Sequence, residues 1–200
     1  IMRKKILLHL LTSPWKFKEI LIVYYFRKDR KNSECAFVPD LKTTQYRWLQ
    51  RRFDMPLEEV ESIIKKWMFD LPSKHLAELG FSSVHTFLNQ LKQKGIPYGI
   101  HSDLPLGQKL EVLNIQADMQ TDATDSDIDA LKPHPAGVMR FAQKLGIETE
   151  EVLVLGDKLE LDGWMAKEAH ALFFHIQTPI ANQQYEKLAS LFKALPVEKK

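Results

Sequence analysis

The spacing of apolar residues divides the chain into two parts. Up to residue 81, apolar positions recur every three or four residues, which is typical of amphipathic helices. The clearest stripe comprises Leu57, Val60, Ile63, Ile64, Trp67 and Met68. From residue 82, short apolar runs alternate four times with helical patterns, which predicts an α/β fold with a parallel sheet and right-handed crossovers. We therefore expect a helical domain over residues 1–81 and an α/β core over residues 82–200.

Turn residues refine this expectation. All eight glycines lie at Gly80 or later, near the predicted ends of elements, where tight turns and helix ends favour glycine. The first part should contain helices over 6–11, 15–27, 43–53 and from 57 onward, with a loop over 28–39. The second part should contain strands over 96–101, 117–122, 152–155 and 171–176. Helices are expected over 83–95, 105–113 and 135–146, with a last amphipathic helix after the fourth strand.

The third of these strands leads into a pair of carboxylates. Val152 to Leu155 run directly into Gly156-Asp157, and Asp162 follows five residues later, where a helical pattern begins. Open parallel sheets bind ligands at the carboxyl ends of their strands, and Mg²⁺ favours carboxylate oxygens while retaining several waters. This stretch predicts a Mg²⁺ site at Asp157 and Asp162, although a strand-end Asp that caps the next helix would give the same local pattern.

Polar groups also follow the first two strands. Ser102 ends one of them, and Lys132 lies in the loop after the next. In a parallel sheet these residues meet the carboxylates at one edge, where a hydroxyl and an ammonium hold phosphoryl oxygens while a metal neutralises charge. His101 and His134 fit ordinary packed or solvent-facing histidines, and the acidic stretch 122–129 fits a solvated loop.

The order and spacing of these motifs resemble the haloacid dehalogenase-like superfamily. IHSD, ending at Asp103, is similar to its second motif, LKPHP around Lys132 to its third, and GDKLELD, ending at Asp162, to its fourth. The resemblance implies a Rossmann-like core with a helical cap over residues 1–81 and Mg²⁺-dependent hydrolysis of a small phosphorylated metabolite. It implies that Ser102 and Lys132 bind the phosphoryl group, that Asp157 ligates Mg²⁺, and that Asp162 ligates it through water or orients Lys132.

The family's first motif, an apolar strand that ends in DxD and supplies the nucleophilic Asp, has no counterpart here. Asp40-Leu41-Lys42 follows a proline and has Lys in the second acidic position, and residues 6–13 contain no acid. In the family that strand is central in the sheet, and its loss would leave two apolar edges unpaired. We expect a truncated chain that lacks roughly 10 to 20 residues and is inactive, or nearly so, alone.

The composition limits the kinds of partner that we expect the chain to bind. A net charge of +2 is too small to indicate nucleic acid, and no apolar run reaches the 18 residues of a membrane span. The single cysteine, Cys35, cannot form an internal disulfide, which favours a reducing cytoplasm. Two alternatives stay open: a catalytically inactive module that binds phosphate, Mg²⁺ or another protein, and a 2-haloacid dehalogenase, against which the acids of GDKLELD argue.

Overall fold

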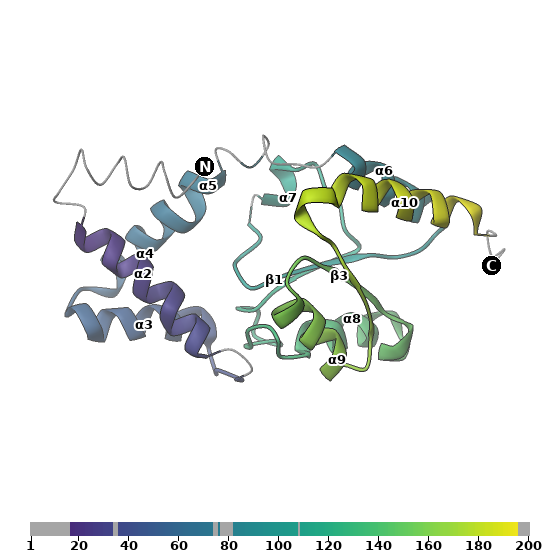
Figure 1. The fold of residues 1–200 in the computed structure, drawn as a ribbon. Coiled ribbons are helices and arrows are strands. Elements are labelled where there is room, and N and C mark those ends of the chain that lie inside the picture. The colour runs from purple at the N-terminus through teal and green to yellow at the C-terminus, as the bar shows by residue number, and fades with distance from the viewer. Residues whose placement is uncertain (1–16, 34–35, 74–75, 77–81, 108, 196–200) are drawn as a thin grey trace.

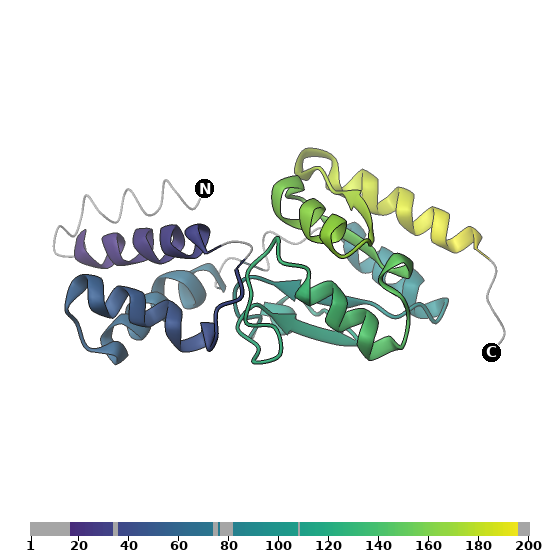
Figure 2. The same ribbon diagram turned by 90° about the horizontal axis from the view of Figure 1, so that it is seen from below.

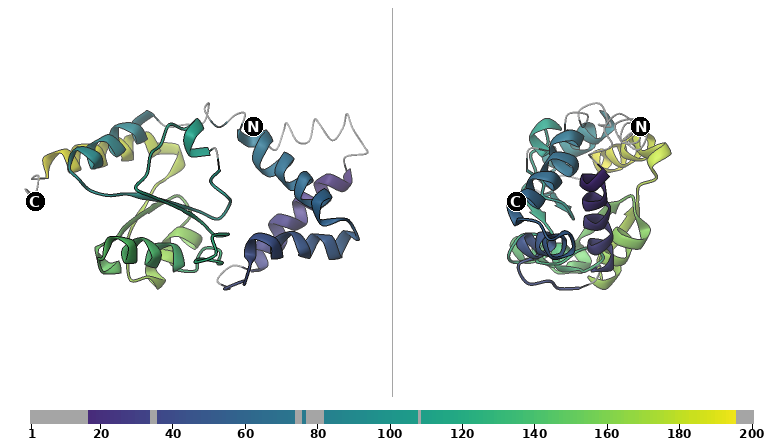
Figure 3. Two further views of the ribbon diagram at one scale, coloured as in Figure 1. Left: turned by 180° about the vertical axis from the view of Figure 1, so that it is seen from behind. Right: turned by 90° about the vertical axis from the view of Figure 1, so that its left-hand side faces the viewer.

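The computed structural model describes residues 17–33, 36–73, 76, 82–107 and 109–195. The helix predicted over residues 6–11 and the boundary at residue 81 lie outside these ranges. The described chain has a helical part and an α/β part, which lie side by side in Figures 1 and 3. None of the described helices combines the length and the apolarity that a bilayer span requires.

The helical part consists of α2 (Phe17–Asn32), α3 (Leu41–Phe53) and α4 (Leu57–Ile64), which continues through a π-helical turn (Lys65–Asp70) into α5 (Leu71–Ser73). Its helices enclose a core of their own, made of Ile22, Phe26, Leu49, Met55, Val60 and Ile64. The predicted stripe of the fourth helix is confirmed, because Val60, Ile64 and Trp67 all point inward and are buried. This core gives the three long helices their packing.

The loop predicted over residues 28–39 begins too early, because α2 runs on to Asn32. The cause is Arg30, which is only 7% exposed. Its guanidinium donates hydrogen bonds to the side-chain oxygen of Gln45 and to the backbone carbonyl of Asp103. A buried arginine with these partners extends the inner face of the helix, but it interrupts the apolar period on which the prediction rested.

The α/β part contains α6 (Ser82–Gln93), β1 (Gly99–Ser102), α7 (Lys109–Val112), β2 (Met119–Asp122), α8 (Ala136–Leu145), β3 (Leu153–Gly156), α9 (Trp164–Glu168), β4 (Leu172–His175) and α10 (Ala181–Ala194). A π-helical turn (Leu159–Gly163) precedes α9, and short 3-10 turns cover Thr149–Glu151 and Thr178–Ile180. All four predicted strands are present. β1, β2 and β4 are shorter than expected, β3 has the predicted length but begins one residue later, and the helix predicted over 105–113 is reduced to α7.

Within the described ranges the strands form two parallel pairs and no continuous sheet. β1 pairs with β2, so that Ser102 lies opposite Asp122, and β3 pairs with β4, so that Gly156 lies opposite His175. Helices α6 and α10 cover one face of the strands and α8 and α9 cover the other, as Figures 1 and 2 show. The α/β class is therefore confirmed, with its sheet interrupted between β1 and β3.

Loops join the helical part to the carboxyl ends of β1 and β2. The carboxylate of Asp129 accepts hydrogen bonds from the backbone N–H groups of Asp40 (3.0 Å) and Leu41 (3.1 Å) at the start of α3. Leu41 is buried and packs with Ala123 and Leu131 of the α/β part. Asp129 therefore caps a helix that begins 88 residues earlier in the chain.

We expect Asp129→Ala to destabilise the chain by about 2 kcal/mol, because two helix-terminal donors lose their acceptor. Asp129 has a φ of 41°, a region that alanine disfavours, so Asp129→Gly separates the lost cap from backbone strain. Asp129→Asn retains an acceptor oxygen and should lose less than either. Urea unfolding measures all three, and equal stability of the glycine variant and the parent chain would contradict a capping role.

Candidate active site

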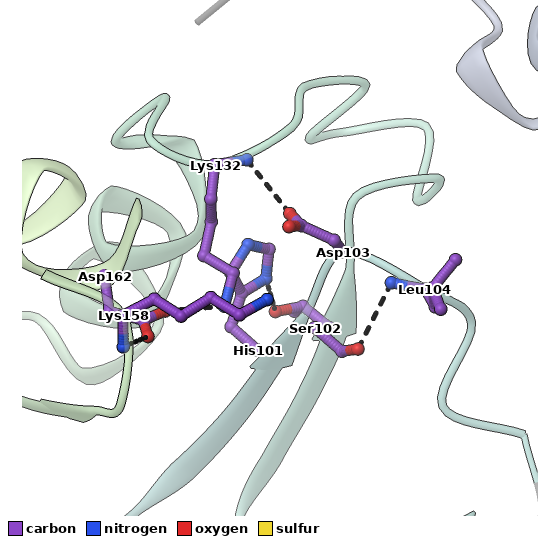
Figure 4. A network of polar contacts seen from close by, with 8 residues as sticks. His101, Ser102, Asp103, Leu104, Lys132, Lys158 and Asp162 are labelled. Atoms are coloured by element: carbon purple, nitrogen blue, oxygen red, sulfur yellow. Dashed lines mark hydrogen bonds and ion pairs between the residues drawn. The ribbon is translucent and has the colours of Figure 1, made fainter. Parts of the chain in front are cut away.

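Residues from three loops meet at the carboxyl ends of β1, β2 and β3 (Figure 4). Ser102 is the last residue of β1, and its Oγ accepts a hydrogen bond from the backbone N–H of Leu104 (3.2 Å). The carboxylate of Asp103 accepts one from the backbone N–H of Lys132 (3.0 Å). Because Asp103 holds the backbone from which the Lys132 side chain projects, the second and third sequence motifs are fixed relative to each other.

The strongest interaction of the site joins Lys132 to Asp162. The ammonium nitrogen lies 2.7 Å from Oδ1 of Asp162, and the two side chains are 15% and 8% exposed. The second carboxylate oxygen accepts the backbone N–H of Lys158 (3.1 Å). A Cβ at Gly156 would lie 2.3 Å from the Cβ of Asp162, so glycine is needed at this strand end for the carboxylate to approach. Asp162 is therefore bonded to Lys132, and its expected role in ligating Mg²⁺ stays a prediction.

Asp157 lies at the end of β3 and is exposed. Its backbone carbonyl lies 3.2 Å from Nε2 of His175, while its carboxylate has no hydrogen-bond partner within the described ranges. In that part of the chain, no three acids, histidines or cysteines cluster as metal ligands do. A carboxylate is the kind of oxygen ligand that Mg²⁺ favours, and the expected metal role of Asp157 stays a prediction.

His101 lies beside this site without an exposed ring. Its Nδ1 is 3.1 Å from the hydroxyl of Thr121, and a Cβ at Gly137 would lie 2.7 Å from the ring. Burial, together with the nearby ammonium of Lys132, lowers the pKa of His101 to about 4. The expectation of an ordinary packed histidine is thus matched by a neutral imidazole in the wall of the site.

Two contacts escaped the sequence analysis. Arg30 reaches from α2 to the carbonyl of Asp103, and burial lowers the pKa of its guanidinium while Asp103 partly opposes that effect. The stretch 122–129 is less solvated than expected, because Asp129 is buried and the adjoining Ile128 and Ala130 are also buried. Asp103 could have been flagged as an acid directly after a strand end, but Arg30 has no local signal among many basic residues.

The region that contains this site matches a known protein family. The model of the haloacid dehalogenase-like hydrolase family matches residues 23–170. The chain belongs to this family of hydrolases. The match includes the helical part from within α2 onward and the loops that carry Ser102, Lys132, Asp157 and Asp162. No solved structure matches the chain significantly.

Curated relatives point to phosphatases within this family. Phosphoglycolate phosphatase of Escherichia coli K12 is 32% identical over 110 residues, which cover 52% of this chain and 43% of the relative. The same enzyme of Shigella boydii gives the same values, and that of Salmonella choleraesuis is 31% identical over the same coverage. The matched region thus spans less than half the length of these relatives.

We expect His101 to remain neutral down to about pH 4. Because its pKa in the folded state lies below the unfolded value of about 6.5, protonation favours unfolding. The stabilising effect of the neutral ring is complete above pH 6.5 and is lost as the pH falls from 6.5 to 4. NMR titration of the imidazole Cε1–H signal measures the midpoint directly. A His101 midpoint near 6.5, or an unchanged pH dependence of unfolding in His101→Gln, would contradict this expectation.

Removal of Lys132 should destabilise the chain more than the loss of a surface ion pair does. Lys132→Met leaves the buried carboxylate of Asp162 without its counter-charge, at a cost of about 3 kcal/mol. In the double variant Lys132→Met/Asp162→Asn no charge is left unpaired, so the loss should be smaller than the sum of the two single losses. Urea unfolding of the four proteins gives the coupling energy, and strictly additive losses would contradict the assigned pair.

Proposed function

We propose that this chain forms the phosphoryl-binding part of a Mg²⁺-dependent phosphatase that hydrolyses a small phosphomonoester through an aspartyl-phosphate. The observation that supports it most is the Lys132–Asp162 pair. Asp162 engages one side of the ammonium group at 2.7 Å. An ammonium carries three donors, so two remain for phosphoryl oxygens at the carboxyl ends of the strands.

The other residues complete the arrangement. The Oγ of Ser102 accepts from Leu104, which leaves its hydroxyl hydrogen to donate to a phosphoryl oxygen. Asp157 would ligate Mg²⁺ with its uncommitted carboxylate. The metal would supply positive charge to the phosphoryl oxygens in the transition state. The lysine would thus place positive charge on one side of the phosphoryl group, and the metal would place it on the other.

The proposed chemistry needs a nucleophilic carboxylate that the described residues do not provide. The carboxylate of Asp103 bonds the backbone of Lys132, and that of Asp162 bonds its ammonium. Neither is free to attack phosphorus, and Asp157 is assigned to the metal. We therefore infer that these residues bind a phosphorylated ligand, and that turnover through an aspartyl-phosphate requires an Asp other than Asp103, Asp157 and Asp162.

The substrate class follows from the relatives. Phosphoglycolate phosphatase of Escherichia coli K12 aligns with 52% of this chain at 32% identity. The proposed ligand is therefore a small phosphorylated carboxylic acid. The helical part, which meets the core at Asp103 and Asp129, would cover the site and select that ligand. We place the protein in the cytoplasm on the strength of its single cysteine, and we propose neither nucleic acid nor a membrane as a partner.

A second candidate function is a non-catalytic module that binds phosphate or Mg²⁺. The observation that favours it is the engagement of the carboxylates of Asp103 and Asp162. The two candidates share the ligand site and differ in turnover. They are separated when a strand that carries an acid is supplied to the chain, because only a phosphatase then gains activity.

Calorimetric titration of this chain with 2-phosphoglycolate tests the ligand site. We expect binding that strengthens at least tenfold with Mg²⁺ and is weakened at least tenfold by Lys132→Met, equivalent to about 1.4 kcal/mol. Lys158→Met is the matched control, because only the backbone N–H of Lys158, not its ammonium, bonds Asp162. Asp157→Asn should abolish the strengthening of binding by Mg²⁺ and leave the affinity measured without Mg²⁺ unchanged. Equal affinities of the two lysine variants would refute the assignment of Lys132.

A further inference from the structure

A second group of polar side chains lies between the helical part and the α/β part. Arg30 and Tyr46 come from the helices, and Lys109 and Asp122 come from the α/β part. The carboxylate of Asp122 acts on the pKa of each of the other three, so the four side chains lie close together. In the β1–β2 ladder Asp122 lies opposite Ser102, and neighbouring strands are about 4.8 Å apart. The group therefore adjoins the candidate active site on the side of the helices.

Lys109 reaches from the α/β part toward the helices. It is the first residue of α7, which follows β1, and it is half-buried. Its Nζ lies 5.7 Å from the centre of the Phe69 ring in the helical part. Within the described residues the ammonium group donates no hydrogen bond and forms no ion pair. Its three donors are therefore available to a ligand.

The surroundings of Lys109 favour an anion beside it. Burial lowers the pKa of its ammonium, Asp122 partly opposes that effect, and the guanidinium of Arg30 lowers the pKa again. Arg30 is itself buried and forms no ion pair in the part of the chain that the structure describes. Two partly desolvated cations that repel each other are stabilised when a negative charge binds next to them.

Tyr46 offers a neutral donor from the helical side. Its ring stacks on that of Phe26 with centres 6.0 Å apart, and the guanidinium of Arg30 lies 5.3 Å from the centre of the same Phe26 ring. The hydroxyl of Tyr46 has no hydrogen-bond partner among the described residues. Burial raises the pKa of this hydroxyl, and the charge of Glu61 raises it further. The hydroxyl is therefore protonated at neutral pH and can donate to a ligand.

The charges of this group favour an anion with a single negative charge. Arg30 already donates to the backbone carbonyl of Asp103, so the ammonium of Lys109 is the more accessible of the two cations. Asp122 stays nearby, with its Oδ1 bonded to the N–H and the hydroxyl of Thr124 at 2.9 and 2.5 Å. Because this carboxylate offsets part of the positive charge, the group suits a carboxylate ligand better than a doubly charged phosphate.

We propose that Lys109 and Tyr46 bind the carboxylate of the phosphorylated ligand, while Lys132 and Ser102 bind its phosphoryl group. This inference rests on the proposed phosphatase function, and it assigns the residues that distinguish a phosphorylated acid from other phosphomonoesters. The ligand carboxylate would not have to break an ion pair, because Lys109 forms none in the described chain. Tyr46 belongs to α3, so the same contact would also tie the helical part to the ligand.

Two ligands that differ in the carboxylate test this assignment. Calorimetric titration in the presence of Mg²⁺ compares 2-phosphoglycolate with ethyl phosphate, which has no carboxylate. We expect the parent chain to bind 2-phosphoglycolate at least tenfold more tightly. Lys109→Met should lose this preference, whereas Lys109→Arg retains the charge and should keep most of it. Lys132→Met should weaken the binding of both ligands, because both carry the phosphoryl group.

Three further variants separate local charge from general effects. Lys92→Met removes an exposed cation of α6 and should keep the full preference. Tyr46→Phe removes one hydroxyl donor and should reduce the preference at least threefold. Asp122→Asn removes the competing negative charge and should increase the preference for 2-phosphoglycolate. Lys109→Gln is a second neutral variant at the decisive position, and the ratio of two affinities within one protein does not depend on how much of it is folded.

The outcomes distinguish this assignment from the proposed function. An undiminished preference in Lys109→Met and Lys109→Gln, or equal binding of the two ligands by the parent chain, would overturn the carboxylate assignment and leave the proposed function intact. If the parent chain binds neither ligand, both proposals fail. A preference that depends on Lys109, together with binding that does not depend on Lys132, would support the carboxylate site and contradict the phosphoryl-binding role of Lys132.

Discussion

The ion pair between Lys132 and Asp162 is the interaction on which the site depends. Lys132 follows the β1–β2 pair and Asp162 follows the β3–β4 pair, and no strand ladder joins these pairs in the described chain. The contact at 2.7 Å therefore fixes the distance between the two halves at their carboxyl ends. Glycine at position 156 makes the contact possible, because any Cβ there would meet Asp162. The position of a phosphoryl group bound at Lys132 would therefore depend on how the two strand pairs are aligned with each other.

Asp103 links that pair to the helical part. Its backbone carbonyl receives the guanidinium of Arg30 from α2, and its carboxylate receives the backbone N–H of Lys132. One residue therefore connects the helices to the loop that presents Lys132. Asp129 makes a second connection by capping α3. A displacement of the helices would therefore act on the position of Lys132 through these two aspartates.

Local patterns predicted the parts of the molecule that local physics controls. Helix α8 ends at Gly146 in the left-handed conformation, and β3 delivers Asp157 and Asp162 as its apolar run implied. Arg30 and Asp129 could not be found this way, because their partners lie 73 and 89 residues away in sequence. Apolar periodicity also overestimated the lengths of β1, β2, β4 and the helix around α7, since it measures which residues face inward and not where backbone pairing stops.

The candidate site and the contact between the two strand pairs depend on the same two side chains. In the described part of the chain no strand ladder joins the β1–β2 pair to the β3–β4 pair, and a cavity of about 500 Å³ is lined by residues of both pairs. Lys132 and Asp162 both line this cavity and approach each other to 2.7 Å. A substitution at either residue therefore alters the site and, at the same time, a contact that holds the two halves of the core together.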